Sequence, residues 1–172
     1  MKNCNPKLKI LEDKYNVILN EILNYKEQWV NWPISRDIDR KGRKYSRKNS
    51  RKYIPLIYTG EDGKLNFISN FFRRFPCTIS ILKSIPKIQN AMITKLDKTS
   101  FLKKIKDGHK SHLRIHLPIY VSNDKRCGIW CNKQTNYLKL GKMIIFDASK
   151  EHTIFNLSDK ERIVLSIDIL NN

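Results

Sequence analysis

Alternation of apolar and polar residues marks the second half of the chain and predicts β-strands there. The clearest stretch is Leu113–Ile119, in which Leu and Ile alternate with Arg114, His116 and Pro118. A period of two is typical of a strand with one buried face, and the other face here would carry Arg and His. The pattern returns after His152 and after Arg162. Strands that each present a His or an Arg on one face indicate a polar pocket inside a β-barrel.

About eight short strands separated by turn residues are expected from residue 91 onward. They are Ala91–Lys95, Ser100–Ile105, Ser111–Val121, Cys127–Asn132, Tyr137–Leu140, Lys142–Asp147, His152–Asn156 and Arg162–Ile169. The preceding segments are expected as a strand at Tyr53–Tyr58, a short helix at Asn66–Phe72, and a helix or strand at Cys77–Ser84. This pattern favours a mainly β fold, a jelly-roll or cupin-like barrel.

The first part of the chain has a different period. Apolar residues at helical spacing predict one amphipathic helix from Leu8 to about Tyr25, and Trp29 and Trp32 would pin it to the outside of the barrel. Because the β pattern begins at Tyr53, the chain divides into a helix with a basic strap, residues 1–52, and a barrel, residues 53–172.

The charge balance is strongly basic. The chain of 172 residues carries 34 Lys and Arg against 16 Asp and Glu, a formal net charge of +18, which favours contact with polyanions. The most basic segment, Arg36–Lys52, lacks apolar periodicity and is expected to be a loop or strap. Two interpretations stay open for it. It is a patch that docks on nucleic acid or an acidic protein, or it is a solvated insertion in a chain whose wealth of Lys, Asn and Ile is typical of an AT-rich genome.

Cysteine usage and the N-terminus indicate the compartment. Cys127 and Cys131 would share a strand face but lie beyond disulfide reach, and no zinc-ligand spacing occurs, so reduced thiols are expected. The first residues lack the apolar core of a signal peptide, and no apolar run is long enough to span a membrane. A cytoplasmic protein without a membrane partner is therefore expected.

Four polar residues define the candidate pocket. Taken singly, Arg114, His116, His152 and Arg162 would each be ordinary strand residues. As a set they carry more weight, because unpaired charge inside a small barrel is costly. Two arginines that point inward need an anion between them.

Several motifs, in order along the chain, resemble one known family. They are Phe75–Thr78, Leu82–Pro86, Leu113–Ile119, Leu140–Asn156 and Glu161–Ile169. From about Phe75 to Leu170 the chain is similar to the aspartyl/asparaginyl β-hydroxylases, which are Fe(II)- and 2-oxoglutarate-dependent oxygenases. The resemblance implies a double-stranded β-helix and an enzyme that hydroxylates an Asp, Asn or Pro side chain of a peptide or amino acid.

The resemblance also assigns roles to residues. Arg162 would take a carboxylate of the co-substrate 2-oxoglutarate, because a buried carboxylate needs a bidentate cationic partner. Arg114 and His116 resemble the family's Arg-x-His, which contacts the same ligand, and Thr94 stands where the family has a Ser hydroxyl. His152 matches the second iron-binding His, in a site that keeps open positions for 2-oxoglutarate and oxygen.

One position departs from the family pattern. Ile105 stands where the first iron-binding His is expected, while Asp107 falls at the carboxylate position. Three interpretations follow. A shifted loop lets His109 complete a site with Asp107 and His152; Asp107 and His152 alone hold iron weakly; or the metal site is lost and the barrel still binds 2-oxoglutarate or another anion. The alternative to an active dioxygenase is therefore an inactive, hydroxylase-like binding module for an anionic partner.

Overall fold

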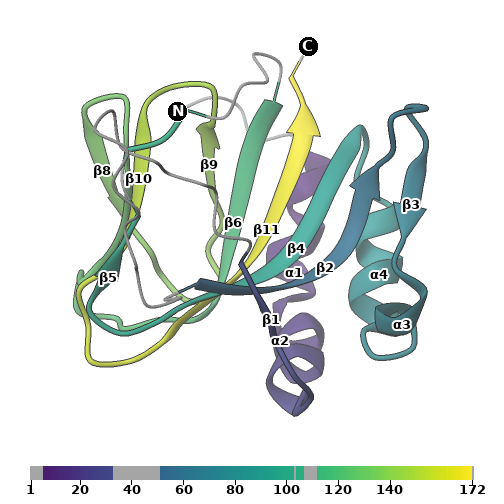
Figure 1. The fold of residues 1–172 in the computed structure, drawn as a ribbon, viewed down its shortest axis with the longest axis horizontal. Helices are drawn as coiled ribbons and strands as arrows, with labels where there is room; N and C mark the ends of the chain where they lie inside the picture. The colour runs from purple at the N-terminus through teal and green to yellow at the C-terminus, as the bar shows by residue number, and fades with distance from the viewer. Residues whose placement is uncertain (1–5, 33–50, 103, 107–111, 172) are drawn as a thin grey trace, which may run out of the picture.

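A computed structural model of the chain describes residues 6–32, 51–102, 104–106 and 112–171. Within them, two antiparallel sheets form the body of the protein (Figure 1). The major sheet has seven strands in the order β1-β2-β4-β11-β6-β9, with β3 paired to β2. Its strands are β1 Val30–Asn31, β2 Arg51–Thr59, β3 Leu65–Phe67, β4 Ile88–Leu96, β6 His112–Tyr120, β9 Ile144–Asp147 and β11 Arg162–Leu170.

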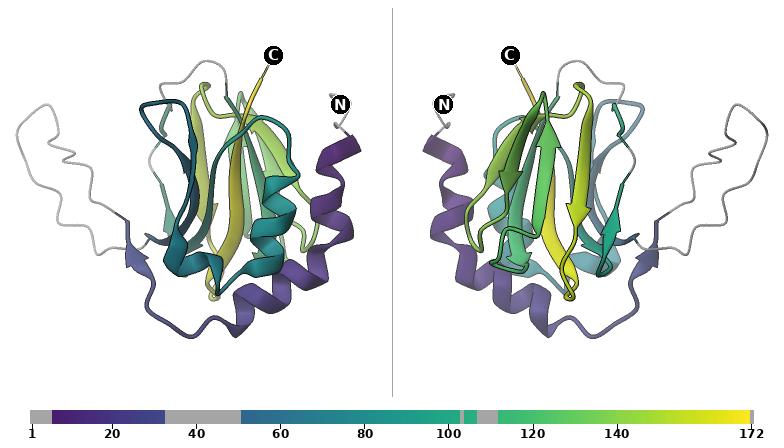
Figure 2. Two further views of the ribbon diagram at one scale, coloured as in Figure 1. Left: turned by 90° about the vertical axis from the view of Figure 1, so that its right-hand side faces the viewer. Right: turned by 90° about the vertical axis from the view of Figure 1, so that its left-hand side faces the viewer.

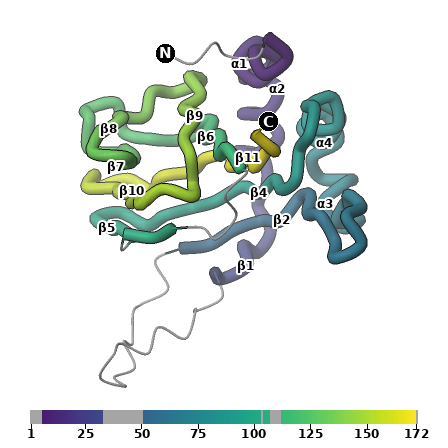
Figure 3. Tube along the Cα trace, turned by 90° about the horizontal axis from the view of Figure 1, so that it is seen from above, coloured from purple at the N-terminus to yellow at the C-terminus, as the bar shows by residue number. Residues whose placement is uncertain are grey.

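The minor sheet has four strands in the order β5-β10-β7-β8. They are β5 Ser100–Phe101, β10 His152–Asn156, β7 Cys127–Cys131 and β8 Gln134–Tyr137. Seen from above, these strands group on one side of the molecule and the helices on the other (Figure 3). A second apolar cluster, which includes Leu96 and Val164 of the major sheet with Ile129 and Ile154 of the minor sheet, joins the two sheets.

The two faces of the major sheet differ because side chains alternate along its strands. In β11, Ile163, Leu165, Ile167 and Ile169 belong to the main apolar cluster. The residues between them, Arg162, Val164, Ser166 and Asp168, point to the opposite face. One face of the sheet therefore belongs to the main hydrophobic core, and the other face, turned towards the minor sheet, combines polar residues with the second apolar cluster.

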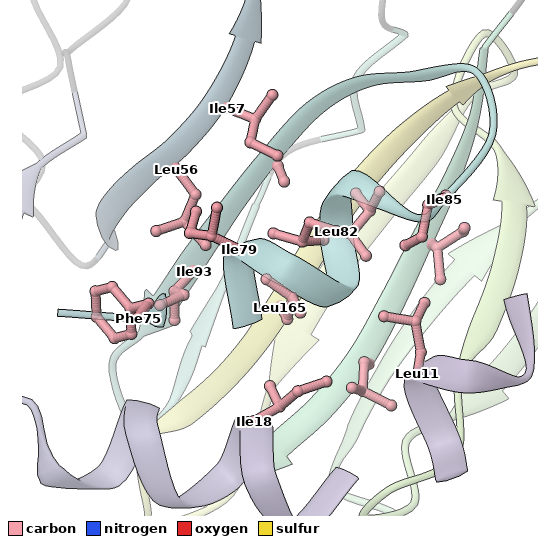
Figure 4. Close-up of a cluster of buried hydrophobic side chains, with 14 of the residues drawn as sticks. Leu11, Ile18, Leu56, Ile57, Phe75, Ile79, Leu82, Ile85, Ile93 and Leu165 are labelled. Atoms are coloured by element: carbon pink, nitrogen blue, oxygen red, sulfur yellow. The ribbon is translucent and has the colours of Figure 1, made fainter. Parts of the chain in front are cut away.

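Helices cover the apolar face (Figure 2). They are the 3-10 helix η1 Pro6–Leu8, α1 Ile10–Asp13, α2 Tyr15–Asn24, α3 Ser69–Phe72 and α4 Pro76–Lys83. Leu11 and Ile18 from the N-terminal helices, and Ile79 and Leu82 from α4, meet Leu165 of the sheet (Figure 4). No helix in the described ranges is both long and apolar enough to cross a membrane.

The expected N-terminal helix is interrupted at Lys14, which separates α1 from α2. Contacts on both sides of the break account for it. Glu12 accepts hydrogen bonds from the Met143 backbone N–H and from Lys142 Nζ, both at 3.0 Å, and the Tyr15 hydroxyl donates to the Ile119 carbonyl at 3.3 Å. The helix α1 is thus attached to the segment that precedes β9, and α2 is attached to β6.

The segment Cys77–Ser84, for which helix and strand were both open, forms most of the helix α4, Pro76–Lys83, and its first position suits proline. Other expected boundaries were wrong. The helix expected at Asn66–Phe72 begins only at Ser69, because Leu65–Phe67 pairs with β2 as β3. The strand expected at Tyr137–Leu140 is instead β8, Gln134–Tyr137. The division of the chain at residues 52 and 53 stays a prediction.

Candidate functional site

Arg162 is the centre of the candidate site. It opens β11 and is 2% exposed, and its Nη2 donates a hydrogen bond to His116 Nδ1 at 3.2 Å. Its Nε is buried and has no hydrogen-bond partner within the described part of the chain. Burial lowers the pKa of Arg162 to about 10, so the guanidinium stays charged at neutral pH. A buried cation with an unpartnered N–H is costly unless an anion binds it.

His116 lies beside Arg162 on β6 and is also 2% exposed. Because a guanidinium can only donate, His116 Nδ1 accepts this bond and the proton of the neutral ring sits on Nε2. Burial, and after it the charge of Arg162, holds the pKa of His116 well below its usual value. His116 is therefore a neutral acceptor that orients Arg162.

A small pocket lies next to this pair, between the two sheets. It is lined by Arg51, Thr94, Lys95, Leu96, Leu102, Ile154 and Arg162. The free volume is about 10 Å³, which is room for about one water molecule, so a larger ligand requires side chains to move. Thr94, on β4, is 4% exposed. The structure thus brings three of the predicted co-substrate residues together: Thr94 and Arg162 in the lining and His116 through its bond to Arg162.

Arg114, the fourth predicted co-substrate residue, is engaged in a bidentate ion pair. Its Nε and Nη2 donate to the two carboxylate oxygens of Asp168 at 2.7 and 2.9 Å. The register of β6 and β11 places the two residues directly opposite each other. The alternation along β11 places Asp168 on the same face as Arg162. The sequence does not show that Asp168 stands opposite Arg114, because this depends on the pairing of β6 with β11.

His152 is fully buried on β10. Its Nδ1 lies 2.9 Å from the Lys150 carbonyl oxygen. A carbonyl can only accept, so Nδ1 carries the proton and Nε2 presents a bare lone pair. Nε2 has no hydrogen-bond partner in the described ranges. A His that donates through one nitrogen to a backbone carbonyl and offers the other is arranged as metal-binding His residues are.

The Phe146 ring contacts both buried histidines. Its centroid is 5.2 Å from that of His116 and 5.3 Å from that of His152. Phe146 therefore gives both imidazoles an apolar neighbour. Sequence reasoning missed this residue, because an apolar side chain within a strand pattern gives no signal of a site.

Ile105 stands directly opposite His152. Each residue donates its backbone N–H to the carbonyl of the other, at 2.8 and 2.9 Å. Residues paired in this way present their side chains on the same face. Ile105 therefore puts a hydrocarbon side chain beside the His152 imidazole, at the position that sequence alignment gives to the first iron-binding His.

The other two predicted metal ligands, Asp107 and His109, lie outside the described residues. Across the described ranges, no group of three or more His, Cys, Asp or Glu residues could hold a metal ion. His152 is thus one well-formed ligand position with an apolar neighbour.

Most of the basic segment Arg36–Lys52 also lies outside the described residues. Its last two members do not belong to a strap, as was expected, but to β2. Arg51 pairs with Leu96 and Lys52 with Lys95 of β4, because β2 starts two residues earlier than the apolar pattern indicated.

Comparisons with known proteins add a family match. The model of the family described as Aspartyl/Asparaginyl beta-hydroxylase matches residues 12–172. The ornithine lipid ester-linked acyl 2-hydroxylase of Rhizobium tropici is 32% identical over 97 residues, which are 55% of this chain and 34% of that protein. The aligned part therefore spans about a third of that relative.

Solved structures match the fold at low sequence identity. An oxidoreductase of the 2OG-Fe(II) oxygenase family from Burkholderia pseudomallei superposes with a TM-score of 0.51 and 10% identity, covering 72% of this chain and 69% of that chain. A cupin domain of an XRE-family transcriptional regulator from Enterobacter cloacae reaches 0.49 at 10% identity, over 72% of this chain and 99% of that chain. The two antiparallel sheets and the match to the oxygenase structure confirm the mainly β, jelly-roll or cupin-like fold expected from the sequence.

Proposed function

Because the chain belongs to the aspartyl/asparaginyl β-hydroxylase family, we propose that it is a hydroxylase that takes 2-oxoglutarate as co-substrate and Fe(II) as its metal. The observation that carries this proposal is Arg162, a buried cation whose Nε has no partner among the described residues and which lines a pocket together with Thr94. A dicarboxylate would supply the missing anion.

The residues of the pocket have distinct tasks in this proposal. Arg162 binds the distal carboxylate of 2-oxoglutarate, and Thr94 donates its hydroxyl to the same ligand. His116, neutral at pH 7, holds the guanidinium in place by accepting from Nη2. Arg114 stays a candidate contact of 2-oxoglutarate. Its guanidinium is already paired with the Asp168 carboxylate, so it would have to bind both groups at once.

The metal site is supported in part by the residues present. His152 Nε2 fits an iron ligand, and Asp107 and His109 are the proposed partners. Bound Fe(II) would supply the activation of oxygen on which hydroxylation depends. The protein's own contribution is to hold the His152 ring by the bond from Nδ1 to Lys150 O, and to exclude water with Phe146.

The substrate proposed from the family is an Asp, Asn or Pro side chain of a peptide or amino acid. The relative from Rhizobium tropici is named for 2-hydroxylation of an acyl chain on ornithine lipid. A fatty acyl group is therefore the first alternative to test once turnover of 2-oxoglutarate is established.

An anaerobic titration with Fe(II) and 2-oxoglutarate tests the proposal. The weak visible band of the protein-bound chelate is expected in the wild type, and it should disappear in His152→Ala. Ile105→His is run alongside, because it places a second imidazole on the same face as His152. A band in Ile105→His but not in the wild type would mean that Ile105 has removed the metal, and the proposal of an active enzyme would be wrong.

A second candidate function is favoured by the pairing of Ile105 with His152. An isoleucine at this point supports a barrel that binds 2-oxoglutarate or another anion without iron and acts as a binding module. Calorimetric titration of metal-free protein distinguishes the two functions, since the module needs Arg162 but not His152.

In the binding module, the part of the basic segment that precedes β2, residues 36–50, would dock an anionic partner, nucleic acid or acidic protein. In that case its charge-neutralised variant loses salt-sensitive binding and keeps 2-oxoglutarate binding.

A further inference from the structure

Cys131 lies directly opposite His152 in the minor sheet. The pairing of β7 with β10 puts the two residues in cross-strand register, and Ile105 flanks His152 on the other side. Residues in direct register share a face of a sheet. Cys131 is 7% exposed and belongs to the apolar cluster between the two sheets, so this shared face is the inner one. No spacing of Cys and His in the sequence indicates these neighbours, because strand pairing brings them together.

His152 and Cys131 form the closer of the two kinds of antiparallel pair. The His152 backbone N–H donates to the Ile105 carbonyl at 2.9 Å, and the His152 carbonyl accepts from the Ile105 N–H at 2.8 Å. Both backbone groups of His152 therefore point away from β7, and its pair with Cys131 has no backbone hydrogen bonds. Side chains approach more closely in such pairs, with Cβ atoms about 5 Å apart.

The two side chains offer a nitrogen and a sulfur on the same face. His152 Nε2 is buried without a hydrogen-bond partner among the described residues, and Nδ1 is fixed by the Lys150 carbonyl oxygen. The Cys131 thiol has a long contact with the Asp147 carbonyl oxygen, at 3.7 Å. A thiol contact of this length is weak, and rotation about the Cα–Cβ bond of Cys131 redirects the sulfur.

A metal ion fits between two such donors. In zinc sites, nitrogen lies about 2.0–2.1 Å and thiolate sulfur about 2.3 Å from the metal, so the nitrogen and sulfur of one tetrahedral site are about 3.6 Å apart. Two side chains whose Cβ atoms are about 5 Å apart can reach this separation. An imidazole that is fixed through its other nitrogen is already oriented for a metal.

The charge near Cys131 suits a cation. Burial raises the pKa of the thiol, and the negative charge of Asp147 raises it further, so the sulfur keeps its proton when no metal is bound. A divalent cation displaces this proton to solvent and takes the thiolate as its ligand. The Asp147 carboxylate, which disfavours a bare thiolate, attracts the cation that replaces the proton.

We infer that Cys131 is a metal ligand beside His152, and that its sulfur replaces the donor that is lost at Ile105. The inference rests on the part of the proposed function that makes His152 a metal ligand, and it does not depend on 2-oxoglutarate. The described residues supply these two ligands and no group of three, so Asp107 or His109 would add a further one. A thiolate favours Zn²⁺ and Co²⁺ over Mn²⁺ and Mg²⁺, and Fe(II) also accepts it.

Anaerobic titration of the whole, metal-free protein with Co²⁺ tests the inference. The d–d bands of cobalt report binding, and a separate near-ultraviolet charge-transfer band reports a thiolate ligand. The wild type should show both. Cys131→Ser should lose the charge-transfer band and weaken Co²⁺ binding about tenfold or more. Cys131→Ala, which brings no polar atom into the apolar cluster, is measured as a second variant and should give the same result.

Cys127→Ser is the matched control. Cys127 is a buried cysteine of the same strand, and its thiol contacts Asn156 Oδ1 at 3.0 Å instead of facing an imidazole. Its replacement should leave the charge-transfer band and the Co²⁺ affinity unchanged. A band that survives both substitutions of Cys131 arises from another thiol and overturns the inference. A band that is lost equally in Cys127→Ser overturns it as well.

The same titration separates this inference from the proposed function. Co²⁺ binding that is lost in His152→Ala but shows no charge-transfer band overturns the inference and leaves His152 as a metal ligand. An absence of Co²⁺ binding in the wild type overturns both the inference and the metal site of the proposed function. Binding of 2-oxoglutarate through Arg162 is measured separately by calorimetry on metal-free protein, where Cys131→Ser should have no effect.

Discussion

The hydrogen bond between Arg162 and His116 links protonation to folding. In the folded protein, burial and the charge of Arg162 hold the pKa of His116 well below 6.5, the value of a free imidazole. Below pH 6.5 the unfolded chain therefore takes up a proton that the folded chain refuses. Stability from this group is present above pH 6.5 and is lost as the pH falls towards the folded-state pKa.

We expect the free energy of unfolding to fall between pH 7 and pH 5, by up to about 1.4 kcal/mol per pH unit from this one group. Urea unfolding at several pH values measures it. His116→Gln should flatten the pH dependence. Parallel curves for wild type and His116→Gln would contradict the prediction.

Arg162 is expected to lower the stability of the folded protein while it contributes to ligand binding. Its charge is buried, and the partner given by its hydrogen bonds is a neutral imidazole. Arg162→Met keeps the length of the side chain and removes the charge, so stability should stay equal or rise by about 1–2 kcal/mol. Binding of 2-oxoglutarate should fall about 100-fold, or roughly 2.7 kcal/mol.

Thermal unfolding and calorimetric titration check the two halves of this prediction. Arg126→Met serves as the control, because Arg126 is exposed and its ion pairs with Asp124 and Asp159 lie on the surface. It should leave binding unchanged. A large loss of stability in Arg162→Met would show that the guanidinium is a structural group.

At the scale of elements, one carboxylate fastens α2 to α4. Glu21 accepts hydrogen bonds from the Cys77 and Thr78 backbone N–H groups, both at 2.8 Å, and from the Thr78 hydroxyl at 2.7 Å. These N–H groups belong to the first turn of α4 and have no acceptor within the helix, and negative charge is favourable at this end of a helix. Glu21 thus caps a helix 56 residues further along the chain.

Glu21→Ala should lower the free energy of unfolding by about 1–2 kcal/mol. Chemical denaturation measures it. Glu27→Ala is the matched control, because Glu27 pairs with Arg74 on the surface, and an exposed pair contributes less than about 1 kcal/mol. Equal effects of the two substitutions would mean that the cap contributes nothing beyond a surface charge.

Strands with a long, regular apolar pattern could be predicted from the sequence. Elements whose bounds depend on contacts with distant parts of the chain could not. The alternation in β6 and β11 identified both strands to within a residue or two, because each buries a complete face. By contrast, all four residues of β8 are exposed, so hydrophobicity carries no signal there. The break at Lys14 depends on contacts with Ile119 and Met143, which are more than 100 residues away.

The same distinction applies to the candidate site. Arg162, His116 and Thr94 were identified through motifs, and they meet in the structure. Arg51 and Asp168 were missed because the pairing of strands brings them to the site, and strand pairing cannot be read from the sequence. The roles of Asp107 and His109 stay predictions.

At the scale of the whole molecule, the helices and the two sheets should unfold together. The N-terminal helices share one apolar cluster with the major sheet, and that sheet shares a second cluster with the minor sheet. Ile18→Ala, in α2, should therefore lower the stability of the entire chain by about 2–4 kcal/mol. Val17→Ala, at an exposed neighbour, should cost less than about 0.5 kcal/mol.

Far-UV circular dichroism and tryptophan fluorescence together test this cooperativity. The two signals should give the same midpoint in wild type and in Ile18→Ala, since elements that share apolar clusters unfold in one transition. Separate midpoints would indicate that the helices and the barrel unfold independently.

The alternation along β11 has a consequence for how mutations would sort. In a library that varies each position of this strand, substitutions at Ile163, Leu165, Ile167 and Ile169 should deplete the protein itself, because they disturb the face packed under the helices. Substitutions at Arg162, on the opposite face, should leave normal amounts of a protein that no longer binds its ligand. Abundance would then fall at every second residue of β11, whereas ligand binding would fall at Arg162 without loss of abundance.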